Sequence, residues 1–340
     1  MEGLGYGEES MLLPKLPKLL RTISRLNCLA FTASTKLDWN GLGSSLTSAL
    51  LYLMHLPTMN HIDLSIIKNF PLSSLPPSVN LLRLDIYDMS SFDIFDIFLF
   101  DRYDEVDEDL SGIILSDMMP KIREFNTSRS TMLTTKLLHA KRQDGLPAFN
   151  FMDLRQVSMH FDQFDDEQNI RYLLQNAKFL ENFRLSVGSN QSSNLWRLRD
   201  ILSRSARTLK VLGFEVPLYD QSFRAPKPLA GLCKELEVME GNNILEALSF
   251  QVNVEGHGSK DSIGSVIQNV EHVLVGPGWP SLKQVSLKVS IPCCVVSRAE
   301  SAALSEALLS LPNEYLGRLS QLDSIVFNFS ASVRKCKACA

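Results

Sequence analysis

The chain has 340 residues, of which 45% are hydrophobic and 21% charged, with 34 Lys and Arg against 38 Asp and Glu. This composition is too apolar for a disordered chain, and a net charge of −4 argues against a nucleic-acid-binding surface. The chain has no apolar run of the roughly 18 residues that a membrane span needs, and residues 1–10 lack the regions of a signal peptide. We therefore expect an intracellular protein, cytoplasmic or nuclear, whose six scattered cysteines stay reduced.

One pattern, apolar-x-x-apolar-x-apolar, recurs along the chain and predicts a series of β-strands. The copies are Leu26-Leu29-Phe31, Met59-Ile62-Leu64, Leu81-Leu84-Ile86, the weaker Ile122-Phe125-Thr127, Leu154-Val157-Met159, Leu180-Phe183-Leu185, Leu209-Leu212-Phe214, Leu245-Leu248-Phe250, Leu282-Val285-Leu287 and Leu322-Ile325-Phe327. Because alternate side chains of a strand point to opposite faces, the last two apolar residues of each copy should face one core. We call these two residues the anchors of each strand.

Between the strands, apolar residues at helical spacing predict helices. These are expected over residues 14–25, 44–55, 168–179, 194–207, 262–274 and 301–311. Asp165 is expected to cap the third of them, with Gln168 three residues later as in a capping box. The connections are long enough for parallel strands, and such crossovers are right-handed in nearly all proteins.

The recurring strand pattern is typical of a leucine-rich-repeat solenoid, in which each repeat buries its apolar face against its neighbours. The fold class expected is therefore α/β, with a parallel sheet on the concave side and helices on the convex side. The mean spacing of about 33 residues exceeds the roughly 20–29 usual for this class, and the usual Asn ladder is absent, so the repeats are irregular. We expect about ten repeats over residues 14–330, between a disordered tail at 1–13 and a C-terminal tail at 331–340.

The longest interval between strand patterns contains an insertion at residues 91–110 that begins apolar and aromatic and then becomes acidic. Its acidic half favours an inserted loop kept in solution by its charge. The alternative interpretation is a docking patch for a basic partner.

The side chains beside the anchors should point away from the core and form the binding face of the concave sheet. The candidate binding residues are His61, Asp63, Arg83, Asp85, Tyr87, Glu124, Gln156, His160, Arg184, Glu215, Gln251 and Lys288. They are polar and mixed in charge, which suits a protein ligand better than a nucleic acid.

The sequence carries no strong catalytic or metal-binding motif. It contains no P-loop, no HExxH and no nucleophile elbow. Cys336 and Cys339 have metal-ligand spacing but no second pair nearby, so a frayed chain end is the preferred interpretation over a zinc site. The acidic residues Asp162, Asp165, Asp166 and Glu167 are better explained as a solvated helix N-terminus than as a cation site. We expect no catalytic residue, cofactor or metal, and so no enzyme.

Three stretches give the chain a family resemblance: LPKLLRTISRLNCLAF at 16–31, FPLSSLPPSVNLLRLDI at 70–86, and PAFNFMDLRQVSM at 147–159 with NIRYLLQNAKFLENFRLSV at 169–187. They resemble the leucine-rich-repeat regions of fungal F-box proteins. The resemblance implies a substrate receptor of an SCF-type ubiquitin ligase, in which an F-box binds the ligase and the repeats bind the substrate. The F-box itself, a helical module of about 40–50 residues, is not recognisable here, and Leu13-Pro14 and Leu16-Pro17 only echo its opening.

The leading hypothesis is thus a non-enzymatic protein-binding module of this type, which would contact SCF components if an F-box lies upstream. A free-standing leucine-rich-repeat scaffold or inhibitor without a ubiquitin link is the main alternative. In either case the terminal repeats leave apolar cross-sections, and we expect the chain to expose hydrophobic surface at one or both ends and to self-associate.

Overall fold

The structure is a computed structural model in which two compact units are distinguished, Met1–Leu154 (unit 1) and Arg155–Ala340 (unit 2). The residues it describes are 15–71, 75, 81–87, 121–141, 145–161, 164–188, 202, 204–219, 228–239, 241, 243–255, 260–292 and 306–334. The expected N-terminal tail, the acidic insertion at 91–110, Asp162 and the Cys336-Cys339 pair lie outside them.

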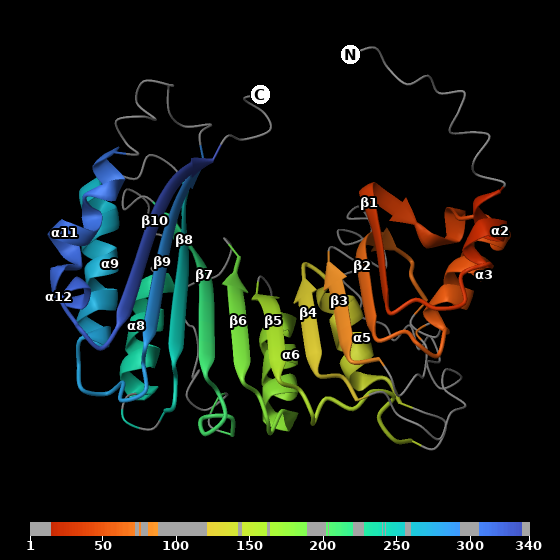
Figure 1. Cartoon of the computed structure of the whole chain (residues 1–340), viewed down its shortest axis with the longest axis horizontal. Helices are drawn as coiled ribbons and strands as arrows, with labels where there is room; N and C mark the ends of the chain where they lie inside the picture. The colour runs from red at the N-terminus through yellow and green to blue at the C-terminus, as the bar shows by residue number, and fades with distance from the viewer. Residues whose placement is uncertain are drawn as a thin grey trace, which may run out of the picture. The chain divides into compact units, whose positions relative to one another are not determined.

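Among its described residues, unit 1 has four parallel strands that pair in chain order. They are β1 (Cys28–Asp38), β2 (His61–Lys68), β3 (Arg83–Tyr87) and β4 (Glu124–Ser128). The helical segments are α2 (Leu16–Leu20), η1 (Trp39–Gly41), α3 (Ser44–Met54) and α5 (Thr131–His139), and α2 packs against α3 (Figure 1).

In the described part of unit 2 there are six parallel strands, which also pair in chain order. They are β5 (Gln156–Phe161), β6 (Asn182–Val187), β7 (Val211–Tyr219), β8 (Ala247–Glu255), β9 (Gln284–Pro292) and β10 (Val326–Arg334). Its helices include α6 (Phe164–Asn176), α8 (Pro228–Met239), α9 (Lys260–Leu274), α11 (Leu311–Tyr315) and α12 (Gly317–Ser320). Strand β10 continues to Arg334, past residue 330, where we expected the repeats to end and the tail to follow.

The strand prediction is confirmed at the level of single side chains. Each of the ten patterns coincides with a strand, and in β2 to β9 both anchors are at most 5% exposed. The weakest copy ends in Thr127, which is buried because its hydroxyl hydrogen-bonds that of Thr134 on α5 at 2.9 Å. The anchors of β1 and β10 are only half-buried. Each of those two strands pairs with a single strand of its own unit.

The helix predictions are right in part. Helices α3 and α9 match their expected ranges closely, whereas α2 is much shorter than predicted. Helix α6 begins at Phe164, so Asp165 lies in its first turn and the prediction that it is the N-cap is wrong. Helices α5 and α8 were not predicted from the sequence.

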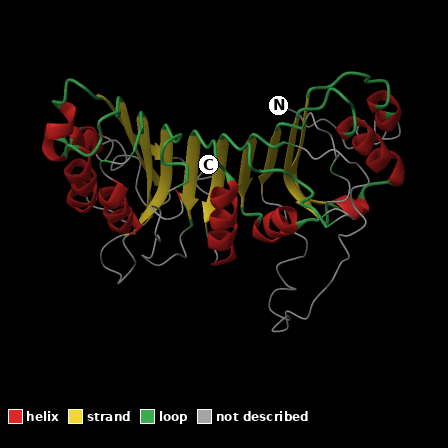
Figure 2. Cartoon of the chain, turned by 90° about the horizontal axis from the view of Figure 1, so that it is seen from below, coloured by secondary structure: helices red, strands yellow, loops and turns green. Residues whose placement is uncertain are grey.

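Helices pack on the face of the sheet to which the anchors point, as α5 does in unit 1 through the bond between Thr134 and the anchor Thr127. In unit 2, α6 lies against β5, α8 against β7 and α9, and α11 against α9, all on the same side of the strands (Figure 2). The chain is therefore an α/β protein in which parallel strands alternate with helices. Among the described helices, none has the length and apolarity to cross a lipid bilayer.

Polar side chains in the turns link each strand with its connecting segment, here called a repeat, to the next one. The Thr58 hydroxyl donates to the Leu26 carbonyl at 2.9 Å and accepts from the Leu26 N–H at 3.0 Å. Thr208 donates to the Leu180 carbonyl at 2.9 Å in the same way. Because these bonds satisfy backbone groups beside the strands, they fix the register of one repeat on the next.

Candidate functional site

The face of each sheet opposite the anchors is here called the open face. In unit 1 the strand register aligns its side chains into three rows. The rows are Cys28, His61, Arg83 and Glu124; then Ala30, Asp63, Asp85 and Asn126; then Thr32, Ser65, Tyr87 and Ser128. Chemistry-bearing side chains thus gather on adjacent strands although they are 22 to 41 residues apart in the sequence.

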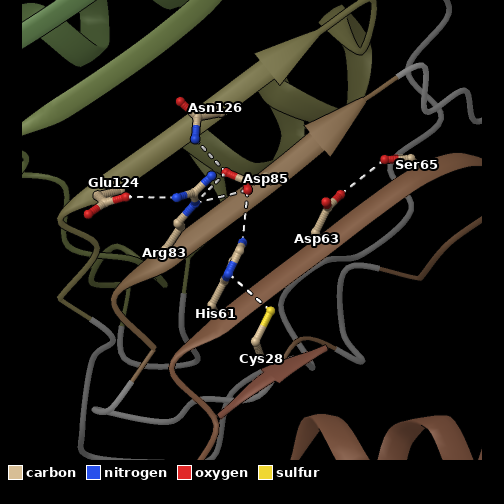
Figure 3. A network of polar contacts seen from close by, with 8 residues as sticks. All are labelled: Cys28, His61, Asp63, Ser65, Arg83, Asp85, Glu124 and Asn126. Atoms are coloured by element: carbon tan, nitrogen blue, oxygen red, sulfur yellow. Dashed lines mark hydrogen bonds and ion pairs between the residues drawn. The ribbon is translucent and has the colours of Figure 1, made fainter. Parts of the chain in front are cut away.

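A continuous polar network crosses the first two rows (Figure 3). It consists of Cys28, His61, Arg83, Asp85, Glu124 and Asn126, and we call it the unit 1 network. His61 lies at its centre, because its Nδ1 is 3.1 Å from the Cys28 Sγ and its Nε2 is 2.8 Å from the Asp85 Oδ2. Beside the network, the Ser65 hydroxyl donates to Asp63 at 3.0 Å.

Asp85 organises the network from beneath, since its side chain is only 2% exposed. A buried carboxylate must be paired and hydrogen-bonded to be tolerated, and this one accepts hydrogen bonds from three residues. The Arg83 Nε donates at 3.0 Å to its Oδ2, Asn126 donates to its Oδ1, and His61 is the third partner. The Arg83 guanidinium also reaches Glu124 at 3.3 Å, which links β3 to β4.

The environment of the network keeps two weak acids protonated. Desolvation raises the pKa of the Tyr87 hydroxyl to about 12, and the nearby carboxylates of Asp85 and Asp63 add to this effect. Partial burial and then Asp63 likewise raise the pKa of the Cys28 thiol, while Arg83 opposes the increase. At neutral pH the resting form of Cys28 is therefore the thiol, S–H.

The open face of unit 2 is built from rows of small and polar side chains. The rows are Gln156, Asn182, Val211, Ala247, Gln284 and Val326; then Ser158, Arg184, Gly213, Ser249, Ser286 and Asn328; then His160, Ser186, Glu215, Gln251, Lys288 and Ser330. Gly213 leaves room for its neighbours in the second row, because a Cβ there would lie 2.9 Å from the Ser249 hydroxyl and 3.2 Å from the Arg184 Cγ and would make these side chains shift. The aliphatic part of Arg184 thus crosses the neighbouring strand at its glycine.

Charges on the open face of unit 2 are unevenly paired. Glu215 accepts hydrogen bonds from Gln251 at 2.9 Å and Asn253 at 2.7 Å, which partly satisfies its carboxylate. Arg184 and Lys288 are exposed, and within the part of the chain that the structure describes neither has an ion-pair partner. This face therefore presents two exposed cations that have no ion pair among the described residues, and one carboxylate, Glu215, that two amides already bind.

All twelve candidate residues predicted from the sequence are placed by the strand register on the open faces. The structure brings four of them, His61, Arg83, Asp85 and Glu124, into direct contact, and it joins Glu215 to Gln251. Asp85 lies beneath its neighbours instead of at the surface. Whether these residues bind a partner stays a prediction.

Sequence reasoning missed Cys28, Asn126 and Asn253. Cys28 was considered only as one of several scattered cysteines, yet it is the residue that directly precedes the first anchor of its strand, as His61 does on β2. Aligning the strand patterns on their anchors would have placed it beside His61. Among the described residues, no three His, Cys, Asp or Glu side chains are close enough together to hold a metal ion.

Comparison with known proteins adds no further identification. No family model matches the chain, and no curated protein matches it.

Proposed function

We propose that this chain is a non-enzymatic protein-binding module of the leucine-rich-repeat type, and that the open sheet face holds the partner. The observation that carries the proposal is the division of every inner strand into buried anchors and polar side chains on the opposite face. A stack of such strands offers a broad, rigid surface whose side chains are free of the core. Surfaces of this kind are the usual binding sites of repeat proteins.

The charges of unit 2 indicate which groups of a partner would be contacted there. Arg184 and Lys288 lie one row apart on strands β6 and β9, and the side chains between them include Ser249, Gln251 and the carboxylate of Glu215, which already accepts two amide hydrogen bonds. Arginine donates to carboxylates through a planar fork, and both cations would gain an ion pair that the described chain does not provide. We infer that acidic side chains of the partner dock on this face.

Charge reversal tests the proposal. The full-length wild-type chain and the double variant Arg184→Glu, Lys288→Glu are immobilised, and the captured cellular proteins are quantified by mass spectrometry. The matched control is Lys234→Glu, because Lys234 is an exposed cation on α8, on the helical face. The wild type and the control should capture equal amounts of the partner. The double variant should capture at least about tenfold less. Equal capture by all three chains would contradict the proposal.

The family resemblance supports a narrower role, that of the substrate-binding repeats of an SCF-type ubiquitin ligase. The test is to sequence the 5′ end of the transcript for an in-frame F-box and to probe the capture for SCF components. The alternative, a free-standing scaffold or inhibitor, predicts that the partner is captured without them. Both roles use the open face as the binding surface, and they differ only in whether the chain is attached to a ubiquitin ligase.

A further inference from the structure

We propose that Cys28 is a nucleophilic thiol, activated by His61 and Asp85, that undergoes thiol–disulfide exchange with low-molecular-weight disulfides. The proposal does not depend on a protein partner. It rests on three side chains from three adjacent strands that form a continuous chain of contacts from sulfur to imidazole to carboxylate (Figure 3). A nucleophile within reach of a base, with the base oriented by a third group, is the arrangement that activates serine and cysteine nucleophiles.

The contacts determine which nitrogen of His61 carries the proton. Asp85 is a buried carboxylate that already accepts from Arg83 and Asn126, so it can only accept from the His61 Nε2. In the neutral imidazole the proton is then on Nε2, and Nδ1 is the lone-pair atom. That atom is the one 3.1 Å from the Cys28 Sγ, so it is placed to receive the thiol proton.

Asp85 also favours the charged state that the reaction creates. When His61 takes the proton from Cys28 it becomes an imidazolium, and the carboxylate 2.8 Å from its Nε2 stabilises that charge. Asp85 is a positioning residue, because it acts through His61 and does not touch the sulfur. Its three donors and its burial hold it in place for this role.

The exchange balances in atoms and electrons. The Cys28 S–H bond breaks, the proton moves to the His61 Nδ1, and the sulfur attacks one sulfur atom of the disulfide. A new S–S bond forms to Cys28 as the original S–S bond breaks. The departing sulfur leaves with the electron pair as a thiolate and takes the proton back from His61. Cys28 is oxidised to a mixed disulfide, and the other half of the disulfide is reduced to a thiol.

Access and surroundings support this assignment. Cys28 is exposed on β1, whereas Cys233 on α8 is buried and its thiol pKa is raised to about 12 by desolvation. The charged groups that act on Cys28 are Asp63 on β2 and Arg83 and Asp85 on β3. Partial burial and the two carboxylates outweigh the opposing effect of Arg83 and keep the sulfur protonated, so unassisted attack by thiolate is slow near pH 7 and a base is needed.

The test measures the reaction of the full chain with hydroxyethyl disulfide, a neutral probe, and follows the peptide that contains Cys28 by mass spectrometry. At pH 7 the His61→Gln variant should react about tenfold to a hundredfold more slowly, because it keeps a polar side chain but loses the base. The control His160→Gln alters another histidine, which contacts Ser186 at 3.2 Å on the open face of unit 2. It should leave the Cys28 rate within about twofold of the wild type.

The pH profile gives a second and independent readout on the wild type alone. An unassisted thiol below its pKa should react about tenfold faster for each pH unit, because the thiolate fraction rises by that factor. With His61 as base, the wild-type rate should rise less steeply between pH 6.5 and 8.5 and level off, and His61→Gln should restore the steep slope. A variant that unfolds would expose the buried Cys233 to labelling. If a variant unfolds, the pH profile of the wild type alone tests the proposal. A tenfold rise per unit in the wild type, or equal rates with and without His61, would overturn the proposal.

Discussion

Leu185 and Arg184 are neighbours on β6 whose side chains point to opposite faces of the sheet. Leu185 is 2% exposed, whereas Arg184 is exposed on the open face. Leu185→Ala should lower the free energy of unfolding by about 2–5 kcal/mol through lost burial and a cavity. Arg184→Ala should change it by no more than about 0.5 kcal/mol. Chemical denaturation of both variants checks the difference, and equal destabilisation would show that the strand register is wrong.

Tyr87 provides a prediction for alkaline pH. Its pKa is raised to about 12 in the folded protein by desolvation, against an ordinary value of 10.0. A group with a raised folded pKa favours folding fully below its unfolded pKa, and that contribution is lost as the pH rises through the folded value. Tyr87→Phe should therefore lose less stability than the wild type between about pH 10 and pH 12. Thermal melts across this range compare them, and parallel pH dependence of the two chains would argue against a buried Tyr87 hydroxyl.

Among the elements, α9 makes two different kinds of contact with the short helices α11 and α12. Its buried Glu271 accepts hydrogen bonds from the backbone N–H groups of Arg318 at 2.8 Å and Leu319 at 3.1 Å, at the start of α12. Its Gly264 lies so close to Tyr315 that a Cβ would overlap the aromatic ring. The glycine thus sets how closely α9 and α11 approach.

Gly264→Ala should therefore destabilise the protein by about 1–3 kcal/mol, although alanine is the better helix former. Gly317→Ala in α12 is the matched control, because a Cβ there meets nothing within 4 Å, and it should be neutral or slightly stabilising. Adding Tyr315→Ala to Gly264→Ala should cost less than the sum of the two single changes, which denaturation measures. Additive costs would mean that the two residues do not meet.

The elements also show which features the sequence could predict. Anchors such as Val285 and Leu287 were predictable because a strand repeats every two residues, so local pattern alone separates the two faces. Helix α5 could not be predicted in this way, because its threonines lower its helical propensity and interrupt its apolar stripe. Four members of the unit 1 network were predicted, but only as separate outward positions, because contact between His61 and Asp85 depends on strand order and register, which no local pattern contains.

At the scale of the whole molecule, the outer strand β10 is the feature that bears on association. Its Val326 is 64% exposed, and its anchor Phe327 and the residue Phe329 on the same face are only half-buried. Among the described residues, no strand pairs with its outer side. A strand edge with exposed apolar side chains is a template for pairing with another chain.

We therefore expect the protein to self-associate as its concentration rises, as measured by light scattering. Val326→Lys should reduce this association, because a charge on an edge strand opposes pairing. Leu309→Lys is the control, since Leu309 is 61% exposed on a helical segment and its replacement removes similar apolar surface away from the strand edge. A monomeric wild type at high concentration, without binding of a hydrophobic dye, would contradict the expectation.

Site-specific photo-crosslinking shows directly whether a partner binds the open face. A photoreactive residue is placed at Lys288 on the open face or at Lys234 on α8, and both full-length chains are exposed to the same cell extract and illuminated. The account predicts a discrete crosslinked partner from position 288 and none from position 234. A partner crosslinked only from position 234 would show that the helical face is the binding surface.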